Sequence, residues 1–360
     1  MPKKFISFFA VLGMLILTGA SCISLGGTTV GPMGVFESTD KAESWKAVSA
    51  FPTNQGVKSI AGIKVFRLYN DPSDSNAIYL ASRGQGLFYT YDNGQNWQSV
   101  PVFNNAFIYG LAVDPTDKCT IYVSDGPHIF KTTDCSRTWK IVYTEERTTE
   151  RLVSLSIDFG DHNVVYGALL GGDIMVSKDA GKSWRVTKRF GFNLQYLTSD
   201  PLTPKRIYVA SYRNGLFRSD DLGENWIDLT AGLDNFSDSR AFNRLVLNGG
   251  QKNSLFWISK YGIVRSDDAG LTWTELKLLT PPGSVNIYAF AINPKNQKEI
   301  YYTGTILGEK NVHVRSTFYK STDGGTNWLT KKLPTNTIPT HLMLHPDNGS
   351  RLFMGFTTLD

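Results

Sequence analysis

The stretch Ser219–Trp226, SDDLGENW, carries the pattern that decides the fold, because the same eight-residue pattern recurs seven times along the chain. The pattern is SxDxGx(S/T/N)W, and its Asp always lies five residues before its Trp. The seven Asp residues are Asp40, Asp92, Asp134, Asp179, Asp221, Asp268 and Asp323. Seven of the eight Trp residues close a copy, and only Trp257 lies outside. Such regular reuse predicts seven copies of one structural unit.

The chemistry of this pattern is that of a tight hairpin turn. A short carboxylate accepts hydrogen bonds from nearby backbone N–H groups, and the Gly takes a left-handed conformation. The Trp begins the return strand, where its ring can cover the hairpin. Two copies replace the Gly, by Ala42 and by Ser136, so we expect those two turns to be more strained or looser.

The spacing of the copies fits the blades of a β-propeller. Successive Asp residues lie 52, 42, 45, 42, 47 and 55 residues apart, and a four-stranded blade takes about 40 to 50 residues. A second sevenfold repeat lies out of phase with the first: an apolar strand, a turn often containing Asp-Pro or Asn-Pro, and a strand rich in Ile, Tyr and Val. Residues 33–360 are therefore predicted to form an all-β, seven-bladed β-propeller of four-stranded antiparallel blades.

The two repeats interleave incompletely at the chain ends. The first element after residue 33 is a hairpin around Asp40, and the last is the strand pair His341–Phe356. These halves should complete one composite N/C-terminal blade, with the strand ending near Phe356 paired to the strand of Val35–Glu37. Such closure hides two sheet edges that would otherwise invite aggregation.

The N-terminus predicts export. Residues 1–21 have two lysines, an apolar run and small residues, the order of a signal peptide. Cys22 then resembles the lipidated Cys of a bacterial lipoprotein, although Gly19 stands where that pattern has an aliphatic residue. Residues 22–32 would be a tether holding the protein at the outer face of a bacterial membrane. The alternatives are ordinary cleavage with secretion and an uncleaved anchor.

The other two cysteines fall in one predicted blade. Cys119 lies in the turn between its first and second strands, and Cys135 in the turn between its third and fourth. Both turns lie on the same face of a propeller, so a disulfide is expected in an oxidising compartment, with two unpaired thiols as the alternative.

The other face of the ring is where we look for function. The loops from second to third strand and the connections between blades meet there, and they differ in sequence between repeats. Basic and aromatic residues in them are the ligand-face candidates: Arg83, Arg151, Tyr212, Arg213, Arg240, Phe242, Arg244, Lys260 and Tyr261. Such a rim suits a protein, in particular an acidic segment, or a glycan. The alternative is that these are solvated loop residues.

The repeated SxDxGx(S/T/N)W pattern resembles the Asp-box, or BNR, β-propellers. These include bacterial sialidases, xyloglucan-type glycosidases, the sortilin family and the photosystem II stability/assembly factor family. The last is the most similar in ring size and blade length, and the resemblance implies a basic patch on one face and a role in assembling membrane complexes. The favoured function is therefore a non-catalytic binding or scaffold propeller. The alternative is a glycoside hydrolase.

Several features separate the chain from the enzymes of that group. Sialidases have an (F/Y)RIP motif, whereas Phe66-Arg67-Leu68 is followed here by Tyr69. Xyloglucan-type enzymes form their cleft between two propellers, whereas one propeller is predicted here. Among the non-enzymes, sortilin-like proteins have longer chains than this one. Hydrolysis would need paired carboxylates. The acidic loop residues that could supply them are Asp125, Glu145, Glu146, Glu150, Asp173, Asp234 and Asp238.

No other ligand class has a signal in the sequence. The five histidines are scattered, and no metal, nucleophile or nucleotide-binding motif is present, so we expect no metal and no cofactor. The net charge of +5 comes from basic residues that alternate with acidic ones, so no nucleic acid partner is expected. The oligomeric state has no sequence signal.

Overall fold

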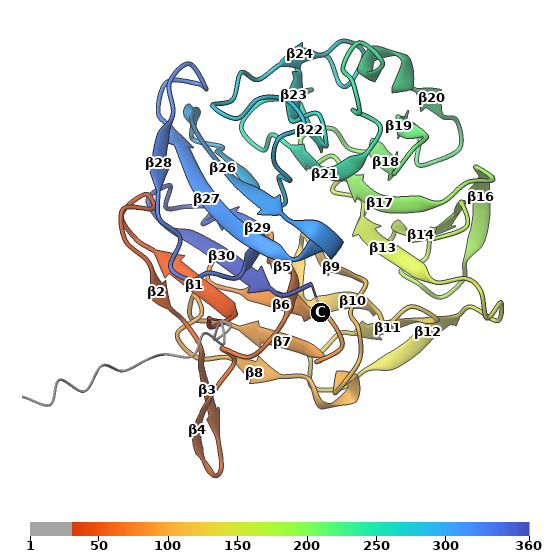
Figure 1. The fold of residues 1–360 in the computed structure, drawn as a ribbon. Helices are drawn as coiled ribbons and strands as arrows, with labels where there is room; N and C mark the ends of the chain where they lie inside the picture. Colours follow the sequence, from red (N-terminus) through yellow and green to blue (C-terminus); the bar gives the residue numbers. More distant parts are fainter. Residues whose placement is uncertain (1–30, 360) are drawn as a thin grey trace, which may run out of the picture. The chain divides into compact units, whose positions relative to one another are not determined.

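Residues 31–359 form a ring of seven four-stranded antiparallel sheets in the computed structural model, which describes this part of the chain (Figure 1). The predicted signal peptide, Cys22 and the tether up to residue 30 lie outside the described residues. The ring confirms the predicted fold class, a seven-bladed β-propeller.

Each blade runs from the centre of the ring outward through four strands. The innermost strands are β5 (Val65–Asn70), β9 (Gly110–Asp114), β13 (Leu152–Ile157), β17 (Leu194–Ser199), β21 (Phe242–Leu247), β25 (Phe290–Asn293) and β29 (Ile338–Leu344). The second strands are β6 (Ile78–Ser82), β10 (Asp117–Ser124), β14 (Val165–Leu169), β18 (Ile207–Ser211), β22 (Leu255–Ser259), β26 (Asn296–Leu307) and β30 (Leu352–Thr357). The third strands are β7 (Leu87–Thr90), β11 (His128–Thr132), β15 (Asp173–Ser177), β19 (Gly215–Ser219), β23 (Ile263–Ser266), β27 (His313–Ser321) and β1 (Gly34–Ser38). The outer strands are β8 (Gln98–Ser99), β12 (Lys140–Thr144), β16 (Arg185–Arg189), β20 (Ile227–Asp228), β24 (Thr274–Glu275), β28 (Leu329–Lys331) and β2 (Lys46–Ala47).

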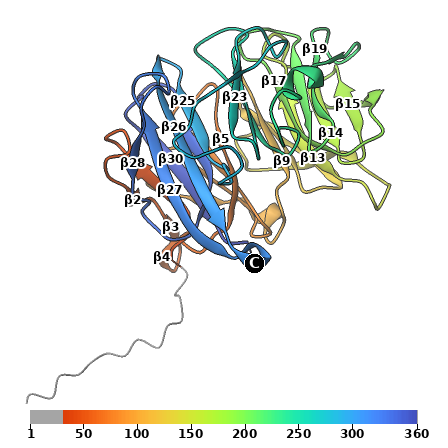
Figure 2. The same ribbon diagram turned by 45° about the horizontal axis from the view of Figure 1, so that its top comes forward.

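A few elements lie outside this scheme. The strands β3 (Ala50–Thr53) and β4 (Gly56–Ser59) form a separate hairpin, and β26 and β27 form the longest hairpin of the ring (Figure 2). Helix within residues 31–359 is limited to three 3₁₀ turns, η1 (Pro101–Phe103), η2 (Thr230–Leu233) and η3 (Glu309–Asn311). No helix in that range is long and apolar enough to cross a membrane.

The core lies between neighbouring blades. The second strands are buried on both faces, which explains why they read as continuous Ile, Tyr and Val runs rather than as alternating ones. Their aromatic residues are fully buried; for example, Tyr122 of β10 reaches the next blade and donates to Ala180 O at 2.8 Å. The innermost strands pack side by side around a central channel, β13 against β9 and β17.

The ring closes through a composite blade, as predicted. Strand β1 pairs with β30 from Gly34 opposite Phe356 to Ser38 opposite Leu352. In Figure 1 the red N-terminal strands therefore share one sheet with the blue C-terminal strands. The rings of Phe36 and Phe356 pack edge to face, 5.3 Å apart, so both hydrogen bonds and apolar contacts hold the closure.

The seven turns with the SxDxGx(S/T/N)W pattern, here called the motif turns, share one hydrogen-bond arrangement. At Asp179 the carboxylate accepts from Ser177 Oγ and from Ser183 N, both at 2.8 Å, and Ser177 Oγ accepts from Gly181 N at 2.8 Å. The residue four positions after each motif Asp donates two hydrogen bonds to its carboxylate, one from the side chain and one from the backbone N–H. These bonds lower the pKa of several motif Asp residues to about 2. These are Asp40, Asp134, Asp179 and Asp323.

The two turns without Gly keep this geometry. Ala42 and Ser136 both have φ of 67°, the left-handed conformation that Gly takes at the equivalent position, as at Gly181 with φ of 85°. An L-residue pays a backbone cost in this conformation. Of the two expected outcomes, a strained turn or a looser one, the structure therefore shows the strained turn.

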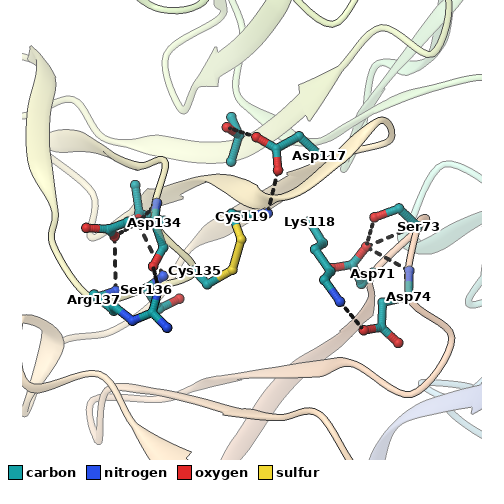
Figure 3. Close-up of a disulfide and its surroundings, with 12 residues drawn as sticks. Asp71, Ser73, Asp74, Asp117, Lys118, Cys119, Asp134, Cys135, Ser136 and Arg137 are labelled. Carbon is teal, nitrogen blue, oxygen red and sulfur yellow. Dashed lines mark hydrogen bonds and ion pairs between the residues drawn. A yellow bond between two sulfur atoms is a disulfide. The ribbon is translucent and has the colours of Figure 1, made fainter.

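The face that carries the motif turns is here called the turn face. Hydrogen bonds between neighbouring blades stabilise it. Lys131 Nζ donates to Ala180 O at 2.9 Å, and equivalent bonds lead from Arg218 to the carbonyl of Ala269 and from Lys320 to that of Lys41. A disulfide joins Cys119 to Cys135 across two turns of one blade (Figure 3). The turn face is thus occupied by structural contacts.

Candidate functional site

The opposite face, here called the loop face, is formed where the loops between second and third strands meet the starts of the innermost strands. Arg83 N in the β6–β7 loop donates to Lys64 O, directly before β5, at 2.9 Å. Leu170 N in the β14–β15 loop donates to Arg151 O, directly before β13, at 2.9 Å. The backbone therefore fixes where the side chains of these loops emerge.

A row of aromatic rings with an arginine at each end lies on this face. The guanidinium of Arg83 lies 5.6 Å from the ring centre of Phe66, which packs against Phe107 at 5.0 Å. Phe107 stacks on Tyr109 at 4.3 Å, and the guanidinium of Arg151 lies 5.4 Å from the Tyr109 ring. We call these five residues the aromatic row. Cation–π contacts of this kind hold the two arginines over the rings.

Four further candidates lie in two other loops of the loop face. Tyr212 and Arg213 are exposed in the β18–β19 loop, where the guanidinium lies 5.7 Å from the Tyr212 ring. Lys260 is exposed in the β22–β23 loop, and the half-buried Tyr261 beside it packs on Phe236 at 5.2 Å. Within residues 31–359, Arg83, Arg151, Arg213 and Lys260 form no ion pair with a carboxylate. We call these four residues the free cations.

The remaining three candidates are placed differently from the expectation. Phe242 is only 5% exposed and packs on Trp257 with ring centres 4.6 Å apart, so its ring belongs to the core. Arg240 is exposed but forms a bidentate ion pair with Asp234, with both bonds at 2.7 Å. Arg244 points into the central channel, where it donates to Thr340 O at 2.9 Å.

Four of the seven acidic candidates for hydrolysis form ion pairs: Asp125, Glu145, Asp173 and Asp234. Arg147 bridges Glu145, at 2.8 Å, and Asp173, at 3.0 Å. The hydrogen bonds from Arg147 lower the pKa of Glu145 to about 2. A general acid needs a raised pKa, so this pair is poorly suited to protonate a leaving group. Asp125 in turn lies 3.1 Å from His128 Nδ1.

Sequence reasoning missed the aromatic half of the site. Phe107 and Tyr109 lie in a connection that reads FNNAFIY, and their alternation was the available signal. The contact with Phe66, 41 residues earlier, depends on how two blades pack and has no local signature. No group of three His, Cys, Asp or Glu side chains in the described part of the chain is placed to hold a metal ion.

Comparison with known proteins places the chain among two kinds of propeller. No family model matches it. A xyloglucanase from a Paenibacillus species is 26% identical over 180 residues, which is 42% of this chain and 18% of that protein. A probable oligoxyloglucan-reducing end-specific xyloglucanase from Neosartorya fischeri is 24% identical over 253 residues, 70% of this chain and 25% of that protein. The chain thus spans a quarter or less of these relatives.

Solved structures share the fold at low identity. The GH74 xyloglucanase from Xanthomonas campestris has a TM-score of 0.64 at 16% identity, over 87% of this chain and 52% of that one. YCF48 bound to D1 peptide has a TM-score of 0.59 at 18% identity, over 82% and 93%. YCF48 from Cyanidioschyzon merolae has a TM-score of 0.61 at 12% identity, over 82% and 95%. GH74 xyloglucanase and YCF48 are therefore both structural neighbours of this chain.

Proposed function

We propose that this chain is a non-catalytic Asp-box binding propeller that holds an acidic protein segment or an anionic glycan on its loop face. The observation that carries the proposal is that several carboxylates of that face form ion pairs, whereas the free cations form none in the described part of the chain. Carboxylates such as Glu145 and Asp173 are held in ion pairs, whereas the free cations have no such partner within residues 31–359. Glu146, Glu150 and Asp238 also form no ion pair there, but each free cation stands beside an aromatic side chain, where a ligand of opposite charge is favoured.

The aromatic row adds a second kind of contact. Aromatic rings supply large contact area at low conformational cost, and they pack against aromatic side chains and against sugar rings alike. Arg83 and Arg151 flank these rings, so one ligand could meet an apolar surface and a guanidinium at each end. Support also comes from YCF48, a propeller of comparable extent whose structure has a D1 peptide bound.

The proposal includes export and a membrane tether. The signal-like residues 1–21 and the following Cys22 support a lipoprotein held at the outer face of a bacterial membrane. Mass spectrometry of the membrane fraction tests this part separately. We expect a mature N-terminus at Cys22 carrying a lipid, and an unmodified soluble form would contradict it.

Fluorescence anisotropy with a labelled peptide of glutamates and tyrosines tests the binding function, with an acidic oligogalacturonide as the glycan probe. Replacing the free cations together by Ala should weaken binding of the preferred probe by at least about tenfold, since each desolvated charge pair contributes appreciably. A matched control variant replaces four exposed cations of the turn face by Ala: Arg137, Lys182, Lys252 and Lys298. Equal loss in both variants, or no loss in either, would contradict the loop face as the site.

A glycoside hydrolase is the second candidate, because the matched relatives and the structural neighbours include xyloglucanases. The lowered pKa of Glu145 weighs against it. Release of reducing ends from xyloglucan provides the test. Activity that disappears on Glu145→Gln or Asp173→Asn, with the Tm unchanged, would establish the hydrolase and overturn the non-catalytic proposal.

A further inference from the structure

A β-bulge occurs at the same place in five of the seven innermost strands. In each of them the register to the second strand shifts near the loop face. The first residues after the shift are Arg67, Ser154, Tyr196, Arg244 and His341. A bulge re-aims the side chain that follows it. Since these residues occupy equivalent positions, they form one layer around the central channel.

The side chains of this layer contact one another across the channel. The guanidinium of Arg67 lies 4.6 Å from the ring centre of Tyr196. Nη1 of Arg244 lies 3.2 Å from Nδ1 of His341. Burial, together with the charges of Arg244 and Arg67, lowers the pKa of His341 well below its usual value. The imidazole is therefore neutral at pH 7 and can accept a hydrogen bond from Arg244.

The channel layer thus contains two positive charges and no compensating carboxylate. Neither Arg67 nor Arg244 forms an ion pair within residues 31–359, and the innermost strands contain one acidic residue, Asp114 at the end of β9. Asp114 is engaged in its own turn, where it accepts from Thr116 N at 2.8 Å. Burial and the charge of Arg67 lower the pKa of Arg244 to about 10. Arg67 and Arg244 are both half-buried, and a charge partly removed from water is stabilised by a partner of opposite sign, so the layer has the electrostatics of an anion site.

A cavity of about 150 Å³ adjoins this layer, and its lining includes Arg67, Tyr69 and Tyr196. It extends to Pro72 and Phe159, which follow the turn-face ends of β5 and β13. The cavity is therefore reached from the turn face, although the guanidinium of Arg67 also lies 5.3 Å from the ring centre of Phe66 in the aromatic row. About 10 to 15 Å³ of such space holds one water molecule, so the cavity has room for a small oxyanion.

We propose that the central channel binds a small oxyanion, a carboxylate, phosphate or sulfate, at the guanidinium of Arg67, with Arg244 as the second positive charge. A cation–π contact with the Tyr196 ring, 4.6 Å away, helps to hold the Arg67 guanidinium in place. Its N–H edge can then form the two parallel hydrogen bonds that suit two oxygens of one oxyanion. The site opens toward the turn face and adjoins the aromatic row at Phe66, and it does not depend on the function proposed for the loop face.

Isothermal titration calorimetry of the purified protein tests the site, with sodium phosphate, sodium sulfate and sodium malonate as probes and sodium chloride as the control at equal ionic strength. We expect saturable one-to-one binding of at least one oxyanion and none of chloride. Arg67→Met should weaken it at least about tenfold and Arg244→Met about threefold or more. The variant that lacks the four free cations should bind within about twofold of the wild type, which separates this site from the loop face.

Two results would overturn the proposal. One is the absence of saturable binding of all three oxyanions to the wild-type protein, which can be measured whether or not the variants fold. The other is unchanged affinity in Arg67→Met. A purely structural role for Arg67 is distinguished by the Tm without added anion. Because the substitution removes repulsion with Arg244, we expect that Tm to stay level or rise, while the rise in Tm caused by the oxyanion disappears.

Discussion

The turn face and the loop face of the ring are built from connections of the same seven blades, yet they differ in every other respect. On the turn face, the motif turns repeat one set of hydrogen bonds, and Lys131, Arg218 and Lys320 link each turn to a neighbour. On the loop face, no two loops share a sequence, and the four free cations have no ion pair in the described residues. Repetition marks the face that holds the fold together, and variation marks the face that is free to bind.

The composite blade provides the severest test of the turn-face architecture. Deleting residues 340–360 would remove β30 and most of β29, leaving β1 as an exposed edge and opening the channel. The loss should exceed the whole stability of a typical domain, about 5 to 15 kcal/mol, so we expect insoluble or proteolysed protein. Expression with solubility and a melting curve measures it. Removing only residues 358–360 is the control and should be tolerated, and a soluble, cooperatively melting 340–360 deletion would refute the closure.

Acid should weaken the turn face strongly. Hydrogen bonds lower the pKa of Asp40, Asp134, Asp179 and Asp323 to about 2 in the folded protein, whereas an unfolded Asp titrates near about 3.9. A lowered pKa means that the carboxylates stabilise the fold fully above about pH 4 and lose that contribution as the pH falls toward 2. Tm measured from pH 5 to pH 2 should fall steeply in this window. The decline should be shallower in Asp179→Asn, which starts from a lower Tm, and a flat profile would contradict the assignment.

Restoring Gly to the two departing turns should stabilise the protein modestly. Ser136→Gly removes a left-handed L-residue and a buried hydroxyl that has no hydrogen-bond partner, so we expect a gain of about 1 kcal/mol in the free energy of unfolding. Ala42→Gly relieves only the backbone and should gain less. Urea unfolding measures both. Ala81→Gly in the buried strand β6 is the control and should destabilise by about 1 kcal/mol.

The smallest effect on stability is expected on the loop face. Replacing Arg83, Arg151, Arg213 and Lys260 by Ala, singly, should change the free energy of unfolding by less than about 0.5 kcal/mol each, since each is exposed and unpaired within residues 31–359. Arg147→Ala is the contrasting change, because it would leave the buried Glu145 without its partner and Asp173 with only Arg189, at 3.5 Å. Equal losses in the free energy of unfolding for Arg147→Ala and for the free-cation changes would contradict the distinction between paired and free cations.

Much of the fold could be predicted because its signals are local. Each motif turn needs an Asp, a residue with left-handed backbone and a Trp within eight positions, and each buried second strand reads as a short apolar run. The positions of the candidate residues in the fold were predicted in part, and their role in binding stays a prediction. Arg83, Arg151, Arg213 and Lys260 do reach the loop face, because loop positions follow from the blade count. Phe242 does not, because it is already paired in β21, opposite Ser259, and its ring packs on Trp257 in the core.

The sequence by itself determined the number of blades, the order of their strands and the pairing of the two chain ends, since a period of about 45 residues is written in the spacing of Asp and Trp. Only the tertiary structure decided which side chains meet. Arg67 reaches Tyr196 from 129 residues away, and Arg244 reaches His341 from 97 residues away. The closing of the ring brings these strands around one axis, and the bulges point their side chains inward. Contacts made by closure have no local pattern, because each strand alone is compatible with many neighbours.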